Sequence, residues 1–203
     1  MYAVVENNNI TQFINYPKSI VIADVRYPAK IFTMWSQAEK EAIGIYEIIT
    51  DSTNYKDPAY YNNTNEQYTF ANGQVTKSWG TATAKRLEDE NAVDEDGNPI
   101  LEDGVQVINY GLKTEKKKIV KQQASNLLAP TDWYVVKATE VADYDIPANI
   151  LSFRADVRTK SNEMETMINN CTTVDELKAL YEYTEQQDGT ITRPLPEFPK
   201  EVI

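Results

Sequence analysis

Residues 67–79 read QYTFANGQVTKSW, two runs of strand-forming character joined by Asn72-Gly73. Asparagine followed by glycine supplies the two positive φ angles of a type I′ turn, and the twist of that turn matches two antiparallel strands. The stretch therefore predicts a β-hairpin, and it indicates that the first part of the chain is built around a sheet.

The residues that precede this hairpin have the same texture. Short runs rich in β-branched and aromatic residues predict strands at 2–6, 10–14, 19–23 and 45–50. The asparagines at 7–9 tolerate positive φ, so the first two strands are expected to form a hairpin. Ser36 and Glu39 have the spacing of a capping box, which predicts a short helix that starts at Ser36 and ends at Gly44.

The period of the apolar residues changes in the second half of the chain. Residues 114–128 carry an apolar stripe with helical spacing, which predicts a helix ended by Pro130. A longer helix is expected to start at Ile146-Pro147 and to run to about residue 168. Thr173 and Glu176 form a second capping box, which predicts a short third helix. The fold class expected is α+β, with a small N-terminal antiparallel β domain followed by a helical region.

An acidic segment separates these regions. Residues 88–103 contain eight carboxylates and no positive charge, interrupted by the turn sequence DGNP at 96–99. Repulsion and turn chemistry predict an exposed linker or hairpin. A calcium loop is the alternative, but no register from Asp94 or Asp96 satisfies the EF-hand pattern. The expected parts are a β-rich domain at 1–87, an acidic linker or hairpin at 88–112, a helical domain at 113–187 and a proline-rich extended tail at 188–203.

Composition limits the classes of partner. The 31 acidic and 20 basic residues give a formal charge of -11, and a surface of that sign repels nucleic acids and anionic lipid headgroups. No stretch reaches the ~20 apolar residues that cross a bilayer. The N-terminus also has no basic flank or apolar signal core. We therefore expect a cytosolic protein that binds neither nucleic acid nor membrane.

Composition also argues against catalysis. The chain has no histidine, which removes Ser-His-Asp and Cys-His chemistry and most zinc and iron sites. No glycine-rich phosphate loop occurs, and the single Cys171 is expected to be a buried small hydrophobe. Carboxylates near the tyrosines of 55–68 could in principle hydrolyse glycosides, but no pattern fixes a pair. We therefore expect that the chain is not an enzyme and that it has no catalytic residue, cofactor or metal.

Three residues of the second half are candidates for binding a partner. Trp133 lies in the stretch LLAPTDWY, and Arg154 and Arg158 lie one helical turn apart, so that they share a face. There they could clamp carboxylates at a junction or on a partner. The alternative is that Trp133 caps the helical core and that both arginines form surface pairs with Asp156 or Glu163.

Aromatic residues elsewhere give a second set of candidates. Tyr60 and Tyr61 lie in a polar loop with several other tyrosines, which is typical of carbohydrate or receptor recognition and of protein interfaces. Phe198 lies among Pro194, Pro196 and Pro199, which enforce an extended tail that either frays or docks on a neighbour.

The second half resembles a known family. A basic helix, the stretch LLAPTDW ending at Trp133, the helix start at Ile146-Pro147 and the stretch FRADVR ending at Arg158 are similar to the C-terminal half of bacteriophage tail-fibre assembly and related tail proteins. The resemblance covers roughly residues 113–168. The acidic insertion and the helix from Thr173 have no counterpart in that pattern.

The resemblance implies a function without catalysis. Such a protein would bind the tail fibre or another tail protein, as a virion component or as an assembly factor. It would be found in the virion tail and, during assembly, in the host cytoplasm. A homo-oligomer is also compatible with the sequence, and recognition of a carbohydrate or receptor by the tyrosine-rich loops is the alternative function.

Overall fold

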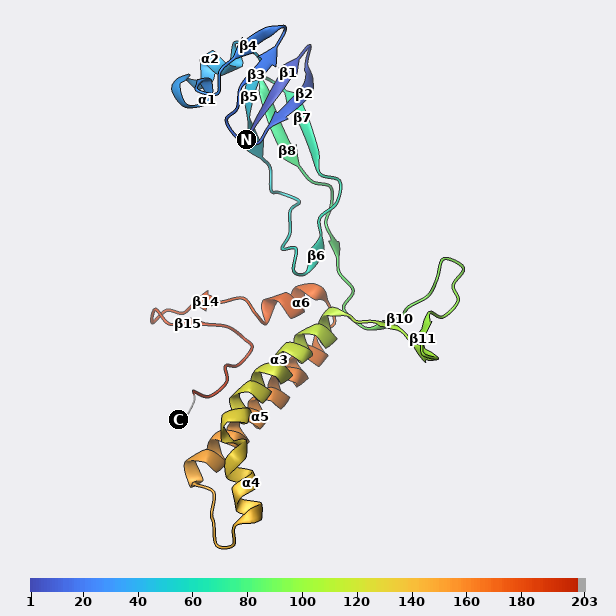
Figure 1. Ribbon diagram of the computed structural model, residues 1–203, viewed down its shortest axis with the longest axis vertical. Coiled ribbons are helices and arrows are strands. Elements are labelled where there is room, and N and C mark those ends of the chain that lie inside the picture. Colours follow the sequence, from blue (N-terminus) through green and yellow to red (C-terminus); the bar gives the residue numbers. More distant parts are fainter. Residues whose placement is uncertain (201–203) are drawn as a thin grey trace. The chain divides into compact units, whose positions relative to one another are not determined.

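The computed structural model describes residues 1–200 and confirms the α+β class (Figure 1). The chain divides into two compact units between Ala84 and Lys85, close to the predicted boundary at residue 87. The acidic segment predicted at 88–112 belongs to the second unit. Each unit is described by itself below.

The first unit is built on a five-stranded sheet with the order β2-β1-β5-β8-β7 (Figure 1). Both predicted hairpins, β1-β2 and β7-β8, are confirmed. Their turn residues Asn7, Asn8, Asn72 and Gly73 all have positive φ. The strands are β1 (Tyr2–Glu6), β2 (Asn9–Ile14), β5 (Ile45–Thr50), β7 (Gln67–Ala71) and β8 (Gln74–Ser78).

One ladder departs from the predicted antiparallel sheet. β5 pairs with β8 in parallel, with Ile48 opposite Val75. The chain leaves β5, crosses a long loop and forms β7 first, so that β8 runs in the same direction as β5. A parallel pair needs such a long connection, and the sequence patterns of the two strands do not reveal it.

Both faces of this sheet are covered by apolar side chains. Successive residues of a strand point to opposite faces, so Val4 packs with Ile14 and Ile45 on one side, while Ala3 and Val5 pack with Val75 on the other. The smaller elements of this unit are β3 (Ile20–Ile22), β4 (Val25–Tyr27), α1 (Ile31–Met34), α2 (Gln37–Glu41), β6 (Tyr61–Asn62) and β9 (Thr83–Ala84). The predicted capping box of Ser36 and Glu39 is present at the start of α2.

The second unit begins with the acidic segment, which forms short strands. They are β10 (Glu90–Asn91), β11 (Leu101–Glu102), β12 (Val105–Gln106) and β13 (Ile108–Asn109). Carboxylates that the sequence analysis treated as mutually repulsive accept hydrogen bonds in turns. Asp94 Oδ1, for example, accepts hydrogen bonds from the backbone N–H groups of Asn98 at 2.8 Å and Asp96 at 3.0 Å. These bonds, above all the one from Asn98, lower the pKa of Asp94.

The predicted helices of this unit are confirmed. α3 (Leu112–Leu128) and α5 (Ala148–Asn170) pack side by side in Figure 1, and Ala124 of α3 meets Phe153 and Val157 of α5. α6 (Val174–Ala179) starts at the second capping box. None of the helices among residues 1–200 is long and apolar enough to cross a membrane.

The sequence predicts that Pro130 ends the helical run, and the structure differs. α3 ends at Leu128, but helical structure continues through Pro130. Pro130 lies in a 3-10 turn, η1 (Ala129–Thr131), which leads directly into α4 (Asp132–Glu140). Proline lacks an N–H group, but the first turn of a helix leaves that group without an intrahelical partner, so proline is tolerated there.

The prediction of an extended tail over 188–203 is wrong at its start. β14 (Thr184–Glu185) pairs with β15 (Ile191–Thr192), because Gly189 takes a positive φ of 80° and Asp188 accepts a hydrogen bond from the N–H group of Thr190. Beyond this hairpin, Leu195 is buried and its N–H group donates to the carbonyl of Leu180. Residues 201–203 of the predicted tail lie outside the described residues.

Candidate functional site

Arg154 joins three helical elements of the second unit. Its guanidinium Nη1 lies 2.8 Å from Asp132 Oδ1, 2.6 Å from Thr131 Oγ1 and 3.0 Å from the carbonyl of Leu128. The last carbonyls of a helix have no partner within the helix, so Arg154 of α5 satisfies one at the end of α3 while it binds the first residue of α4. The Arg154 side chain is only 8% exposed.

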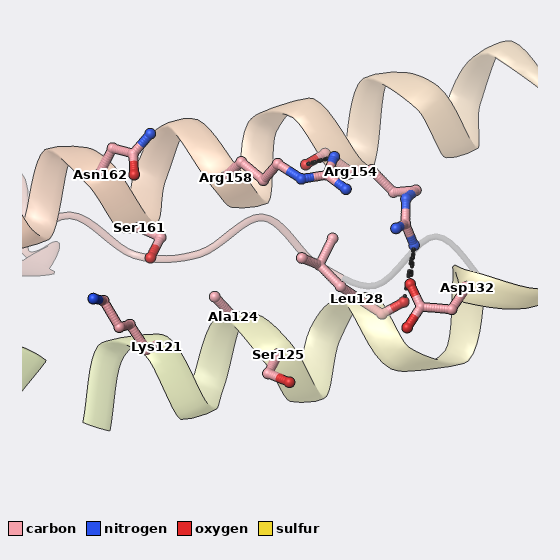
Figure 2. A pocket seen from close by; sticks show the side chains of 9 residues that line it. All are labelled: Lys121, Ala124, Ser125, Leu128, Asp132, Arg154, Arg158, Ser161 and Asn162. Atoms are coloured by element: carbon pink, nitrogen blue, oxygen red, sulfur yellow. Dashed lines mark hydrogen bonds and ion pairs between the residues drawn. The ribbon is translucent and has the colours of Figure 1, made fainter. Parts of the chain in front are cut away.

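A groove lies between α3 and α5 beside this junction (Figure 2). Its volume is about 480 Å³. The helices supply opposite walls, and Asp132 closes one end. The nine residues that line it are Lys121, Ala124, Ser125, Leu128, Asp132, Arg154, Arg158, Ser161 and Asn162.

The cations of this groove are neutralised to different degrees. Arg154 pairs with Asp132, and Lys121 Nζ lies 3.3 Å from Glu165 Oε2. Arg158 is exposed, and its Nη1 donates one long hydrogen bond of 3.3 Å to the carbonyl of Arg154. Among residues 1–200, no carboxylate forms an ion pair with Arg158. Its charge therefore faces the groove without an acidic partner from the described part of the chain.

The helix that follows the groove has an unusual surface. α4 contains no buried residue, and apolar side chains are among those it exposes. Trp133 and Val136 are each 51% exposed, and Val141 at the C-terminal end of the helix is 47% exposed. We call these three residues the α4 surface. The ring of Trp133 lies against that of Tyr134, with centroids 3.8 Å apart, so the two aromatic rings form one block of apolar area.

The structure brings some of the predicted site residues together. Trp133 follows Asp132 directly, and Arg154 and Arg158 line the same groove. Arg154 acts at a junction within the chain, and the predicted surface pair with Asp156 or Glu163 is wrong, because Arg154 is buried and bonded to Asp132. Arg154 therefore positions the start of α4 and is not available to bind a partner.

Other predicted candidates are less accessible than the sequence analysis assumed. Tyr60 and Tyr61 belong to the first unit and are each 5% exposed. A ring buried to that degree offers no face to a sugar. Phe198 packs against the core cluster of Ala124, Phe153 and Val157. The proline-rich tail thus docks on its own unit at this point.

Sequence analysis missed several residues of the groove. Ser161 follows Arg154 and Arg158 at helical spacing, so the same periodicity argument could have found it. Lys121, by contrast, lies on α3, and nothing local pairs it with residues of α5. Thr131 and Asp132 were present in the quoted motif but received no role, because their contact with Arg154 depends on how the helices pack.

Comparison of the chain with protein-family models, with curated proteins and with solved structures finds no match. The function of the site is therefore argued from its geometry. Among residues 1–200, no group of three or more His, Cys, Asp and Glu side chains could hold a metal ion. What the site offers is an exposed helix with apolar side chains, an arginine that no described carboxylate neutralises, and a polar groove, which are the components of a binding surface.

Proposed function

We propose that this chain is a non-enzymatic protein of a bacteriophage tail that binds the tail fibre or another tail protein. The observation that carries the binding function is α4, a nine-residue helix with no buried residue and with Trp133 half exposed. The resemblance of residues 113–168 to tail-fibre assembly and related tail proteins supports the assignment to a tail. The protein acts as a virion component or as an assembly factor.

The energetics of α4 support a role in contact with another protein. A helix this short is marginal in water on its own, so it depends on its N-terminal anchorage, where Asp132 binds Arg154. Burying the α4 surface would gain ~25 cal/mol per Å² of apolar area. Tryptophan is among the residues that most often dominate binding energy at interfaces. The chain thus holds in place a surface that gains free energy only when a partner covers it.

The alternative of carbohydrate recognition has weaker support. It rested on the tyrosines of 55–68 as an aromatic platform. Tyr60 and Tyr61 are buried, whereas Tyr55 is 43% exposed with its ring 4.7 Å from that of Trp79.

Co-expression with the neighbouring tail-fibre gene product, followed by affinity pull-down and size-exclusion chromatography, tests the proposal. We expect the wild-type chain to be retained with the fibre and Trp133→Ala to reduce that retention. Tyr16→Ala is a matched control, because Tyr16 is an aromatic residue of the first unit that is 66% exposed. A fibre that trimerises without this chain and never retains it would contradict the proposal.

Mass spectrometry of purified virions separates the two variants of the function. A virion component remains at a fixed ratio to the other tail proteins in intact particles. An assembly factor is present in the infected cell and absent from the particles.

A further inference from the structure

We propose that the groove between α3 and α5 binds carboxylate side chains of an acidic peptide segment on the partner protein, with Arg158 as the main contact. This inference rests on the proposed function, because it names the chemistry of the partner surface that a binding protein of this kind would recognise.

The groove inverts the charge of the chain locally. The chain as a whole has a formal charge of -11, yet the groove is lined by three cations, Lys121, Arg154 and Arg158, against the single carboxylate of Asp132. A concave site whose sign opposes that of the whole surface concentrates ligands of the opposite sign. The ligand favoured here is an anion.

Arg158 has the chemistry that binds a carboxylate. Its guanidinium presents donors in a planar fork that matches the two oxygens of a carboxylate. Arg154 and Lys121 are already engaged by Asp132 and Glu165, whereas Arg158 donates a single long bond to a backbone carbonyl. Arg158 is thus the cation of the groove with the most unused donor capacity.

The lining around Arg158 adds polar and apolar contacts for a ligand. Ser125, Ser161 and Asn162 supply hydroxyl and amide groups that can donate to further oxygens of a ligand. Ala124 and Leu128 form an apolar part of the opposite wall, which α3 supplies. A volume of about 480 Å³ lies within the range of sites that hold a ligand the size of a few residues.

A short peptide segment is the source of the anion that the chain's charge favours. A nucleic acid is disfavoured, since its phosphates meet a chain that is strongly negative overall. A second copy is disfavoured more strongly than a short acidic segment, because two whole chains of -11 repel each other over their full surfaces, whereas a short segment places its carboxylates only at the cationic groove. Trp133, the first residue of the α4 surface, follows Asp132 at the end of the groove. One peptide segment with carboxylates beside apolar residues could therefore occupy the groove and cover α4.

Fluorescence anisotropy of the full chain with labelled hexaglutamate tests the inference, with hexaglutamine as the uncharged reference. We expect hexaglutamate to bind and hexaglutamine not to bind. Arg158→Gln should weaken binding by about tenfold or more, the value of a charged hydrogen bond or two. Arg158 is exposed, so its substitution should leave the thermal unfolding temperature almost unchanged.

Two controls separate the groove from general attraction to positive charge. Lys118→Gln removes an exposed cation of α3 that does not line the groove, and Arg26→Gln removes an exposed arginine of the first unit. Both should change hexaglutamate binding by less than about twofold. Equal weakening by Lys118→Gln and Arg158→Gln would overturn the inference, as would an absence of hexaglutamate binding.

Further outcomes decide between sources of the anion. Displacement of hexaglutamate by an equal concentration of inorganic phosphate would mean that the groove takes any anion, which contradicts a peptide site. Self-association in analytical ultracentrifugation that Arg158→Gln abolishes would make a second copy the occupant, and this too contradicts the inference.

The pull-down distinguishes failure of this inference from failure of the proposed function. If the wild type retains a tail protein and Arg158→Gln retains it equally well, the groove is not the contact, while the proposed function stands. If the wild type retains no tail protein, the proposed function fails, whether or not the chain binds hexaglutamate.

Discussion

The guanidinium of Arg154 lies 2.8 Å from the carboxylate of Asp132, and this pair ties the second turn of α5 to the start of α4. The partners differ in environment, since the side chain of Arg154 is 8% exposed and that of Asp132 is 60% exposed. Arg154 also donates hydrogen bonds to the hydroxyl of Thr131 and to the carbonyl of Leu128. It therefore contributes more to the stability of the fold than its ion pair alone.

Arg154→Met is expected to destabilise the second unit by about 3 kcal/mol, since it removes the donor to the buried hydroxyl of Thr131 and leaves the carbonyl of Leu128 with only the hydrogen bond from that hydroxyl. Asp132→Asn should cost about 1 kcal/mol or less, because the carboxylate is largely solvated. Urea unfolding followed by far-ultraviolet circular dichroism measures both. Equal losses from the two substitutions would show that Arg154 acts only through the ion pair.

Gly111→Ala is expected to destabilise the junction between the acidic segment and α3. A Cβ atom there would lie 2.4 Å from the backbone carbonyl oxygen of Glu88, which cannot move aside as a side chain could. The expected cost is about 1 to 3 kcal/mol by chemical denaturation. Gly97→Asn is the control, because no atom lies within 4 Å of a Cβ at Gly97 and asparagine tolerates its positive φ. A wild-type stability for Gly111→Ala would contradict this reading of the contact.

The capping box of α6 should make stability depend on pH. Hydrogen bonds from the N–H and hydroxyl groups of Thr172 lower the pKa of Glu176 from its ordinary value of 4.5. A carboxyl whose pKa is lower in the folded state stabilises that state above its unfolded pKa, and this contribution disappears as the pH falls through the folded value. Glu176→Gln should therefore reduce stability above about pH 4.5 and cost progressively less below it.

Thermal unfolding of wild type and Glu176→Gln between about pH 3 and pH 7 measures this difference. Exposed Glu140 provides the control as Glu140→Gln. A difference between wild type and Glu176→Gln that stays constant over the whole range would exclude the titration of Glu176 as its cause.

Thr173→Ala tests the other half of the same capping box. The hydroxyl of Thr173 accepts a hydrogen bond of 3.1 Å from the N–H group of Glu176. Loss of such a cap typically costs about 1 kcal/mol. Thr173→Ser keeps the hydroxyl and should retain most of the stability in the same denaturation experiment. If both substitutions cost the same, the hydroxyl does not cap the helix.

Cys171 is expected to react slowly with alkylating reagents in the native protein. It is buried, and burial raises the pKa of its thiol, so that little reactive thiolate is present at neutral pH. Iodoacetamide at about pH 8 should modify the native chain at least about tenfold more slowly than the chain in urea. Intact-protein mass spectrometry measures the two rates, and equal rates would mean that Cys171 is accessible when folded.

Local signals predicted much of the fold. The Asn72-Gly73 turn, the asparagines of the first hairpin, both capping boxes and the three helices beginning near residues 114, 146 and 173 were all found from the sequence. The turn at Ala23-Asp24 was missed, because alanine with a positive φ gives no sequence signal. α4 was missed because Pro130 was taken as the end of the helical run.

The candidate site was predicted only in part. Arg154 and Arg158 were found because they share one face of one helix, and Trp133 was found from its motif. The burial of Arg154, and that of Tyr60 and Tyr61, could not be predicted. Burial depends on which distant segments cover a residue, and a single sequence does not contain that information.

The sequence by itself determined the elements whose formation depends on neighbours a few positions away, because turns, caps and helical stripes are made by residues within one or two turns of each other. Only the tertiary structure decided the parallel pairing of β5 with β8, the groove that brings Lys121 near Arg158, and the exposure of α4. Each of these depends on packing between segments far apart in the chain, where many arrangements satisfy the same local preferences.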